Sequence, residues 1–226
     1  MLSDVMEDYL KAIHHLSDGE RVSTSGIAEY LGVSPSTVTS MLAKLEERGL
    51  ADYEKYEGAV LTEEGETVAL EVLRHHRLLE SYLAERLDYD WADVHDEADR
   101  LEHHISEEFE RRIAATLDDP EVDPHGDPIP GADLAPVEEA ETSRLSDHGA
   151  GETVVVERVR DRDGDELDYL AEAGVTPGTR LEIKEVAPFG MVTVRVDGAT
   201  QSLPERIATS IRVRAVSDRA EPGLTR

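Results

Sequence analysis

The sequence predicts a mainly α-helical protein with a small β domain at its C-terminal end, and three observations support this prediction. Apolar residues recur at helical spacing through most of residues 1–117. Prolines and acidic residues then break the pattern over residues 118–150, which we interpret as a linker. Beyond it, residues 151–226 contain short β-branched runs. We divide the helical part into domains at 1–64 and 65–117.

The N-terminal domain is predicted to hold three helices. The spacing of apolar residues places the first over residues 4–17, and a short second helix ends at Gly32. Ser34 is expected to cap a third helix, with Pro35 at its first position, that runs to Gly49. Two helices joined across a glycine turn are typical of a helix-turn-helix.

Residues 50–62 alternate about a turn at Glu57-Gly58 and predict a two-stranded wing. A winged helix-turn-helix of this kind binds double-stranded DNA through the start of its second helix, where short hydroxyl side chains reach bases and phosphates. The alternative roles are N-capping for Ser34 and a solvated surface for the other hydroxyls. The candidate DNA contacts are Ser34, Ser36, Thr37, Ser40 and Lys44.

The second domain contains two long amphipathic patterns, over residues 65–87 and 91–117. Helices that are this apolar on one face need a partner surface. Self-association supplies one directly, so we expect a homodimer.

The stretch HDEADRLEHH, residues 95–104, places imidazole and carboxylate groups on one stripe of the second pattern. At about 100° per residue, four of them fall within roughly a third of the helix circumference. They are His95, Asp99, Glu102 and His103. Such a stripe is a divalent-metal surface. Because 33% of the residues are charged, an acidic stripe also arises by chance, and this one alone leaves both readings open.

A second pair of potential ligands, on the other helical pattern, favours the interpretation as a metal site. His76 and Glu80 are four residues apart on the other helical pattern, again beside leucines. His75 and His104 point about 100° away from the chosen histidines, so we expect both to be exposed.

The sequence contains no cysteine, so any metal must bind to nitrogen and oxygen ligands. No apolar run approaches the ~20 residues of a membrane span. The N-terminus lacks the basic and apolar segments of a signal peptide. We therefore expect a cytoplasmic protein without membrane association.

The net charge of −28, from 51 acidic and 23 basic residues, would ordinarily argue against binding to DNA. The acidity is spread through every segment, however, which is typical of a protein kept hydrated in very high salt. In such salt the Debye length is ~3 Å or less, so net charge no longer excludes a DNA partner. We infer a halophilic source.

The C-terminal domain is predicted to be a small SH3-like β-barrel. Its strands are expected at residues 153–159, 180–186, 191–196 and 211–216, and a short helix is expected at 166–173.

These motifs resemble those of the metal-dependent repressors of the diphtheria-toxin-repressor and manganese-transport-regulator group. The resemblance covers nearly the whole chain, through MEDYLKAI, RHHRLLE, VHDEADRLEHHIS and PHGDPIPG. The C-terminal domain is similar to the ferrous-transport accessory fold. The resemblance implies a homodimeric transcriptional repressor that binds a palindromic operator, controls metal-uptake genes and uses Mn²⁺ or Fe²⁺ as corepressor, with one or two ions per subunit.

The resemblance also implies the ligands. One site would contain Asp8, Asp99, Glu102 and His103, and the other His76, Glu80 and His95. The barrel can lend further ligands in this family, and the candidates here are Asp163, Asp165 and Glu166.

Two positions bear on the choice of metal. Asp8 and Asp99 stand where the toxin-repressor branch has methionine and cysteine, and carboxylates favour Mn²⁺ or Fe²⁺. Lys11 stands where manganese regulators have a further carboxylate, which puts a bridged manganese pair in doubt.

Two alternatives belong to other classes of protein. A di-metal carboxylate enzyme would use Glu-x-x-His pairs or a His-Glu-x-x-His motif, and neither spacing occurs in the sequence. A winged-helix regulator of another ligand would leave the histidine and carboxylate faces unexplained.

Overall fold

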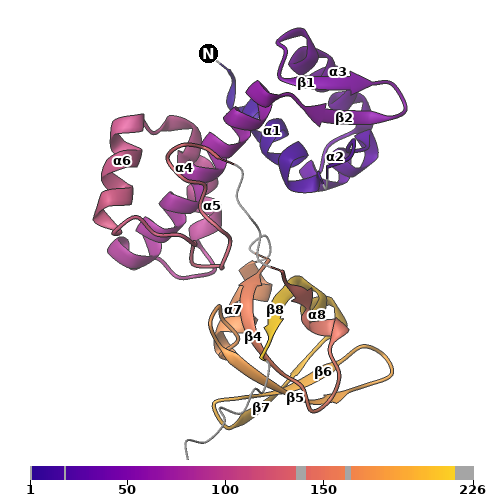
Figure 1. Cartoon of the computed structure of the whole chain (residues 1–226), viewed down its shortest axis with the longest axis vertical. Coiled ribbons are helices and arrows are strands. Elements are labelled where there is room, and N and C mark those ends of the chain that lie inside the picture. Colours follow the sequence, from indigo (N-terminus) through magenta and orange to yellow (C-terminus); the bar gives the residue numbers. More distant parts are fainter. Residues whose placement is uncertain (1, 18, 136–140, 161–163, 217–226) are drawn as a thin grey trace, which may run out of the picture. The chain divides into compact units, whose positions relative to one another are not determined.

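The computed structural model describes residues 2–17, 19–135, 141–160 and 164–216. It confirms the mainly α fold with a small β domain (Figure 1). The chain forms two compact units. The first comprises Met1–Tyr82, Asp96–Glu121 and Ile129–Val137, and the second comprises Leu83–His95, Val122–Pro128 and Glu138–Arg226. Among the described residues, no helix has an apolar stretch long enough to cross a membrane.

The N-terminal part of the first unit is a winged helix-turn-helix. Its elements are α1 (Asp4–Leu16), α2 (Thr24–Leu31), α3 (Pro35–Glu47), β1 (Ala51–Glu54) and β2 (Gly58–Leu61). Gly32 ends α2 in the left-handed region with φ 65°, where glycine meets no steric penalty. The Ser34 hydroxyl accepts the backbone N–H of Thr37 and caps α3, as predicted. Leu10, Ile27 and Leu42 join the three helices in a fully buried core.

The wing turn lies one step earlier than expected. Glu54 pairs with Gly58, so the turn consists of Lys55, Tyr56 and Glu57, and Gly58 opens β2. Gly58 packs against the strand-like residue Val22, whose carbonyl oxygen would lie 2.3 Å from a Cβ at this position. This close approach explains the glycine and anchors the wing to the loop before α2.

The helical region contains α4 (Glu63–Leu87), α5 (Val94–Leu101), the 3-10 turn η1 (Glu102–His104) and α6 (Glu107–Thr116). The prediction of one helical pattern over 91–117 was therefore wrong. Ile105 is extended, and the Ser106 hydroxyl accepts the N–H of Phe109 to cap a new helix. Apolar periodicity missed the break because Leu101, Ile105 and Phe109 stay in phase across it.

Part of the predicted linker is fixed in the first unit. Arg74 of α4 is buried, and its guanidinium donates to Glu110 Oε1 at 2.5 Å and to the carbonyl oxygen of Pro130 at 2.6 Å. The N–H of Ile129 bonds to the carbonyl of Glu121. Through Arg74, these contacts tie the segment at Pro130 to α4 and α6.

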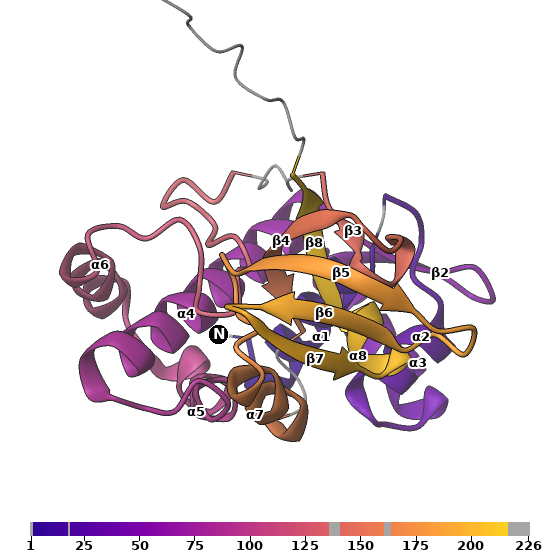
Figure 2. The ribbon, with the colours of Figure 1, turned by 90° about the horizontal axis from the view of Figure 1, so that it is seen from below.

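The second unit contains a six-stranded antiparallel sheet in the order β3-β8-β4-β5-β6-β7 (Figure 2). Its elements are β3 (Ser143–Arg144), η2 (Leu145–Asp147), β4 (Thr153–Val159), α7 (Gly164–Glu172), β5 (Arg180–Val186), β6 (Val192–Val196), β7 (Ala199–Leu203), α8 (Glu205–Ser210) and β8 (Ile211–Ala215). The predicted strands and helix are thus present, within a small SH3-like domain. Trp91 and Ala92, which precede α5, pack against its core.

Four elements of this sheet domain, β3, η2, β7 and α8, were missed by sequence analysis. β7 is an edge strand with a mostly exposed polar sequence, so it lacks the alternation that marks a strand. It follows β6 through Asp197-Gly198, both at positive φ, as a two-residue hairpin requires. β3, η2 and α8 are too short to show a period. Because β3 pairs with β8, the sheet begins at Ser143, before the expected limit at 151.

Candidate metal centre and DNA-binding surface

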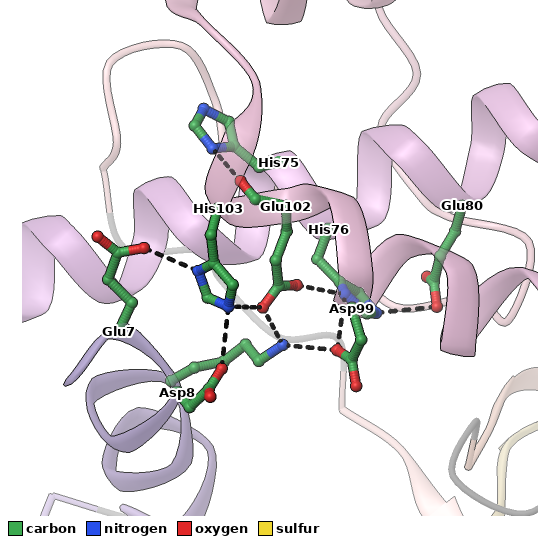
Figure 3. Close-up of polar contacts among 9 residues, drawn as sticks. Glu7, Asp8, His75, His76, Glu80, Asp99, Glu102 and His103 are labelled. Atoms are coloured by element: carbon green, nitrogen blue, oxygen red, sulfur yellow. Dashed lines mark hydrogen bonds and ion pairs between the residues drawn. The ribbon is translucent and has the colours of Figure 1, made fainter. Parts of the chain in front are cut away.

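Three potential ligands of the first unit meet where α1 faces η1 (Figure 3). Asp8 comes from α1, and Glu102 and His103 come from η1. One ligand atom of each lies within 4.8 Å of those of the other two. His103 Nε2 is 3.1 Å from Asp8 Oδ1 and 3.3 Å from Glu102 Oε1, while its Nδ1 is 2.7 Å from Glu7 Oε2. We call Asp8, Glu102 and His103 the Asp8 cluster.

Glu102 also belongs to a second group, the Asp99 cluster, which is His76, Asp99 and Glu102. Nδ1 of His76 lies 2.6 Å from Glu102 Oε2 and 3.3 Å from Asp99 Oδ1. Its Nε2 lies 3.0 Å from Oε1 of Glu80, one turn along α4. The side chains of Glu80 and Glu102 are fully buried. The His76–Glu80 face predicted from spacing therefore points inward.

Lys11 of α1 adds a cation to the same region. Its Nζ donates to Asp99 Oδ1 at 2.9 Å and to Glu102 Oε1 at 2.6 Å. The lysine side chain is 15% exposed and that of Glu102 is fully buried, so their bond is largely shielded from water, whereas the Asp99 side chain is 47% exposed.

The carboxylates raise the pKa of each basic group among them. A hydrogen bond with Asp8, helped by Glu7 and Glu102, raises the pKa of His103 to about 9. Burial alone would lower the pKa of His76, but Glu80 and Glu102 outweigh it and raise the pKa to about 10. The pKa of Lys11 is also raised, because Glu102 and Asp99 outweigh the effect of burial. In the metal-free protein these three cations balance the buried acids.

Of the residues expected on one stripe, Asp99, Glu102 and His103 are divided between two clusters that share Glu102. Glu102 and His103 face Asp8, whereas Asp99 lies with His76 and Lys11. The α-helix ends at Leu101, so the stripe does not continue through the 3-10 turn.

The expectation that His75 is exposed was wrong. It is 8% exposed, and its Nδ1 donates to the backbone carbonyl of Glu102 at 3.1 Å. The end of α5 leaves carbonyl groups without helical partners, and the His75 ring satisfies one of them. His104 is exposed, as expected.

Other predicted ligands lie in the second unit. His95 belongs to it, and its part in a metal site stays a prediction. Asp165 is exposed, and Asp163 lies outside the described residues. The buried carboxylate of Glu166 accepts the Ser210 hydroxyl at 2.8 Å and lies 3.6 Å from Arg206.

Sequence analysis missed a further pair of ligand types in the second unit, Asp123 and His125, which are both buried. Asp123 Oδ1 accepts the N–H groups of His125 and Asp127 at 2.8 and 2.9 Å. His125 Nε2 donates to the carbonyl of Trp91 at 3.1 Å, and its ring lies against the indole. The feature of the sequence that could have indicated this pair is a histidine within a proline-rich, acidic segment.

The start of α3 offers a surface for DNA. Its predicted contacts, which are Ser34, Ser36, Thr37, Ser40 and Lys44, are all exposed. The Ser34 hydroxyl also bonds to those of Ser36 and Thr37, each at 2.8 Å. The fully buried Val38 and Leu42 hold the opposite face of the helix against the core.

Comparisons with known proteins agree with this arrangement. Residues 1–59 match the family model "Iron dependent repressor, N-terminal DNA binding domain". Residues 62–131 match "Iron dependent repressor, metal binding and dimerisation domain", and residues 143–215 match the FeoA domain.

Full-length relatives extend the match over the whole chain. The iron-dependent repressor IdeR of Mycobacterium tuberculosis is 35% identical over 95% of this chain and 99% of its own length. The diphtheria toxin repressor of Corynebacterium glutamicum is 33% identical over 95% and 98%. A solved structure titled "Manganese-dependent transcriptional repressor complex with manganese" is 40% identical, with a TM-score of 0.85 over 93% of this chain and all of that one. The chain therefore belongs to the iron-dependent repressor family, which includes IdeR and the diphtheria toxin repressor.

Proposed function

We propose that this protein is a transcriptional repressor that binds double-stranded DNA as a homodimer when Mn²⁺ or Fe²⁺ is bound. One observation carries the proposal: Asp8 of the DNA-binding domain and Glu102 and His103 of the helical domain have ligand atoms within 4.8 Å of one another. The site thus takes ligands from both parts of the first unit.

The donor set fits the proposed ions. Carboxylate oxygen and imidazole nitrogen suit Mn²⁺ and Fe²⁺, and no soft sulfur ligand is present in the cluster. A bound ion would supply a positive charge that joins Asp8 to Glu102 and His103. Asp99 lies close enough to Glu102 to support it. We propose His76, Glu80 and His95 as the second set of ligands.

Metal dependence follows from the link between the two domains. Loss of the ion removes one tie between α1 and η1, which allows other orientations of the winged helix. A differential affinity of about 5.5 kcal/mol would take the dimer from mostly unfit to mostly fit for its operator. Since a dimer presents two α3 helices related by symmetry, the operator is expected to be palindromic.

Corepression by a metal implies control of genes for its uptake. No catalytic role is proposed, because the site residues act here as ligands and the motifs of metal enzymes are absent from the sequence. Action on chromosomal DNA accords with the expected cytoplasmic location. The domain limits at 64 and 117 stay proposals.

DNA binding by purified protein tests this function. A duplex is selected from a random-sequence pool on the Mn²⁺-loaded dimer, and its affinity is measured by fluorescence anisotropy at molar salt with and without Mn²⁺ or Fe²⁺. Metal should tighten binding by roughly 5- to 150-fold, the usual range of allosteric coupling. Glu102→Gln and His103→Ala should abolish the response and leave the dimer folded.

The matched control is His104→Ala, because His104 is exposed and adjacent to His103. It should respond as wild type does. A normal metal response in Glu102→Gln would show that the site is wrongly assigned, and DNA affinity independent of every metal would contradict the function itself.

A further inference from the structure

Glu102 contributes to the Asp8 cluster and to the Asp99 cluster at once. Its two oxygens are divided between them, since Oε1 is 3.3 Å from His103 and Oε2 is 2.6 Å from His76. Donor positions alone would therefore allow two divalent ions bridged by this carboxylate.

A lysine side chain already lies at the Asp99 cluster. Lys11 Nζ bonds to Asp99 Oδ1 at 2.9 Å and to Glu102 Oε1 at 2.6 Å. An ammonium group has three donors and no lone pair, so it competes with a metal ion for these oxygens and cannot act as a ligand. Glu102 Oε1 has a second acceptor position, which leaves it available to the Asp8 cluster.

The helix α1 delivers this cation together with a ligand. Asp8 and Lys11 are three residues apart, so they lie on the same face of α1. Asp8 gives an oxygen to the Asp8 cluster, and Lys11 gives a positive charge to the Asp99 cluster.

A divalent ion at the Asp99 cluster would have to lie beside this ammonium. The Glu102 and Lys11 side chains are 0% and 15% exposed, so water screens the repulsion only from the side of Asp99, whose side chain is 47% exposed.

We propose that Lys11 is the resident cation of the Asp99 cluster and limits the two clusters to one divalent ion, bound at the Asp8 cluster. This inference rests on the proposed function, since it takes the Asp8 cluster as a metal site. Lys11 also orients the Asp99 and Glu102 carboxylates and ties α1 to α5 and η1 without metal.

Metal counting and electron paramagnetic resonance on the full-length protein loaded with Mn²⁺ test this inference. Wild type should show uncoupled ions. Lys11→Gln, which removes the charge, and Lys11→Glu, which adds a carboxylate, should each bind one more Mn²⁺ per chain. The added ion should give the exchange-coupled signal of a carboxylate-bridged pair.

Two controls separate charge from disturbance of the fold. Lys11→Arg keeps the positive charge and should match the wild-type count and spectrum. Lys55→Gln makes the same chemical change at an exposed position of the wing turn and should also match wild type. Circular dichroism establishes that each variant is folded.

A coupled pair of Mn²⁺ ions in wild type would overturn the inference. This test needs only the wild-type spectrum, so it does not depend on whether any variant folds. An unchanged ion count in folded Lys11→Gln and Lys11→Glu would overturn it too. Failure of the proposed function has a different signature, because wild type and all variants would then bind no Mn²⁺, and the inference would fall with it.

Discussion

The side chain of Glu102 is the central acid of the candidate site. It is fully buried, yet Lys11, His76 and His103 all lie within 3.3 Å of its oxygens. A buried carboxylate without partners would be strongly destabilising, so these cations make its burial possible. The metal-free site is therefore a network of protonated groups that a metal must displace in part.

This network predicts how the stability of the metal-free protein depends on pH. Hydrogen bonding with Asp8 raises the pKa of His103 to about 9, and Glu80 and Glu102 raise that of His76 to about 10, against an ordinary value of 6.5. Both pKa values are raised in the folded state, so the stabilisation is fully present below pH 6.5 and is lost as pH rises through 9 to 10.

Urea unfolding in the presence of a chelator across this pH range measures the effect. His103→Ala should flatten the decline between pH 6.5 and about 9 and leave the part above it, which is due to His76. His104→Ala should leave the whole decline unchanged. A stability that stays constant above pH 6.5 would refute the assigned protonation of the two imidazoles.

We also expect single residues to set the choice of metal. We favour Mn²⁺ over Fe²⁺, because Asp8 and Asp99 offer oxygen where sulfur ligands would favour softer ions. The double variant Asp8→Met, Asp99→Cys should therefore shift activation toward Fe²⁺ and softer ions. Operator affinity measured against each metal at molar salt tests this, and identical activation profiles for wild type and variant would show that these positions do not set metal choice.

At the scale of elements, the break between α5 and α6 positions the ligands. The α-helix ends at Leu101, so Glu102 and His103 lie in the 3-10 turn, and the extended Ile105 follows that turn. This end frees the Glu102 carbonyl for His75, which holds the backbone at the site. A continuous helix would have used that carbonyl in its own hydrogen-bond ladder.

The cap of α3 gives a prediction about stability. Ser34→Ala removes the acceptor for the Thr37 N–H and should lower the free energy of unfolding by about 1 kcal/mol. Ser40→Ala, on the exposed face of the same helix, should change stability by less than about 0.5 kcal/mol while weakening DNA binding. Urea unfolding compares the two variants, and equal losses would contradict the capping role.

At the scale of the whole molecule, the sheet domain has its own core, and that core extends beyond the sheet. Leu145, Val154, Leu167 and Ile211 are fully buried in it. Trp91, which lies far earlier in the sequence, packs against the same core. The second unit therefore combines the C-terminal domain with two short segments of the preceding region.

Truncation after residue 140 tests this organisation. The remaining protein should stay dimeric and bind DNA with an altered metal response, since the first unit keeps its own core. The fluorescence emission of Trp91 should shift to longer wavelength, because the truncation removes the core that covers it. Loss of the dimer in analytical ultracentrifugation would instead place the main interface on the C-terminal domain.

The sequence by itself determined what lies within one turn or one helix. The Ser34 cap, the Gly32 turn and the His76–Glu80 pair were predictable because helical spacing brings such residues together without any tertiary contact. The metal-binding family was also predictable, since each motif that carries the resemblance is a continuous stretch of sequence.

Only the tertiary structure decided which ligands meet. His103 and Asp8 are 95 positions apart, and their contact depends on how α1 packs against η1, which no local pattern encodes. The helix end that divides the stripe into two clusters is likewise set by a capping serine and by His75. In the sequence Lys11 was only a missing ligand. Packing turns it into a cation bonded to Asp99 and Glu102, because the fold brings α1 beside α5 and η1 at this point.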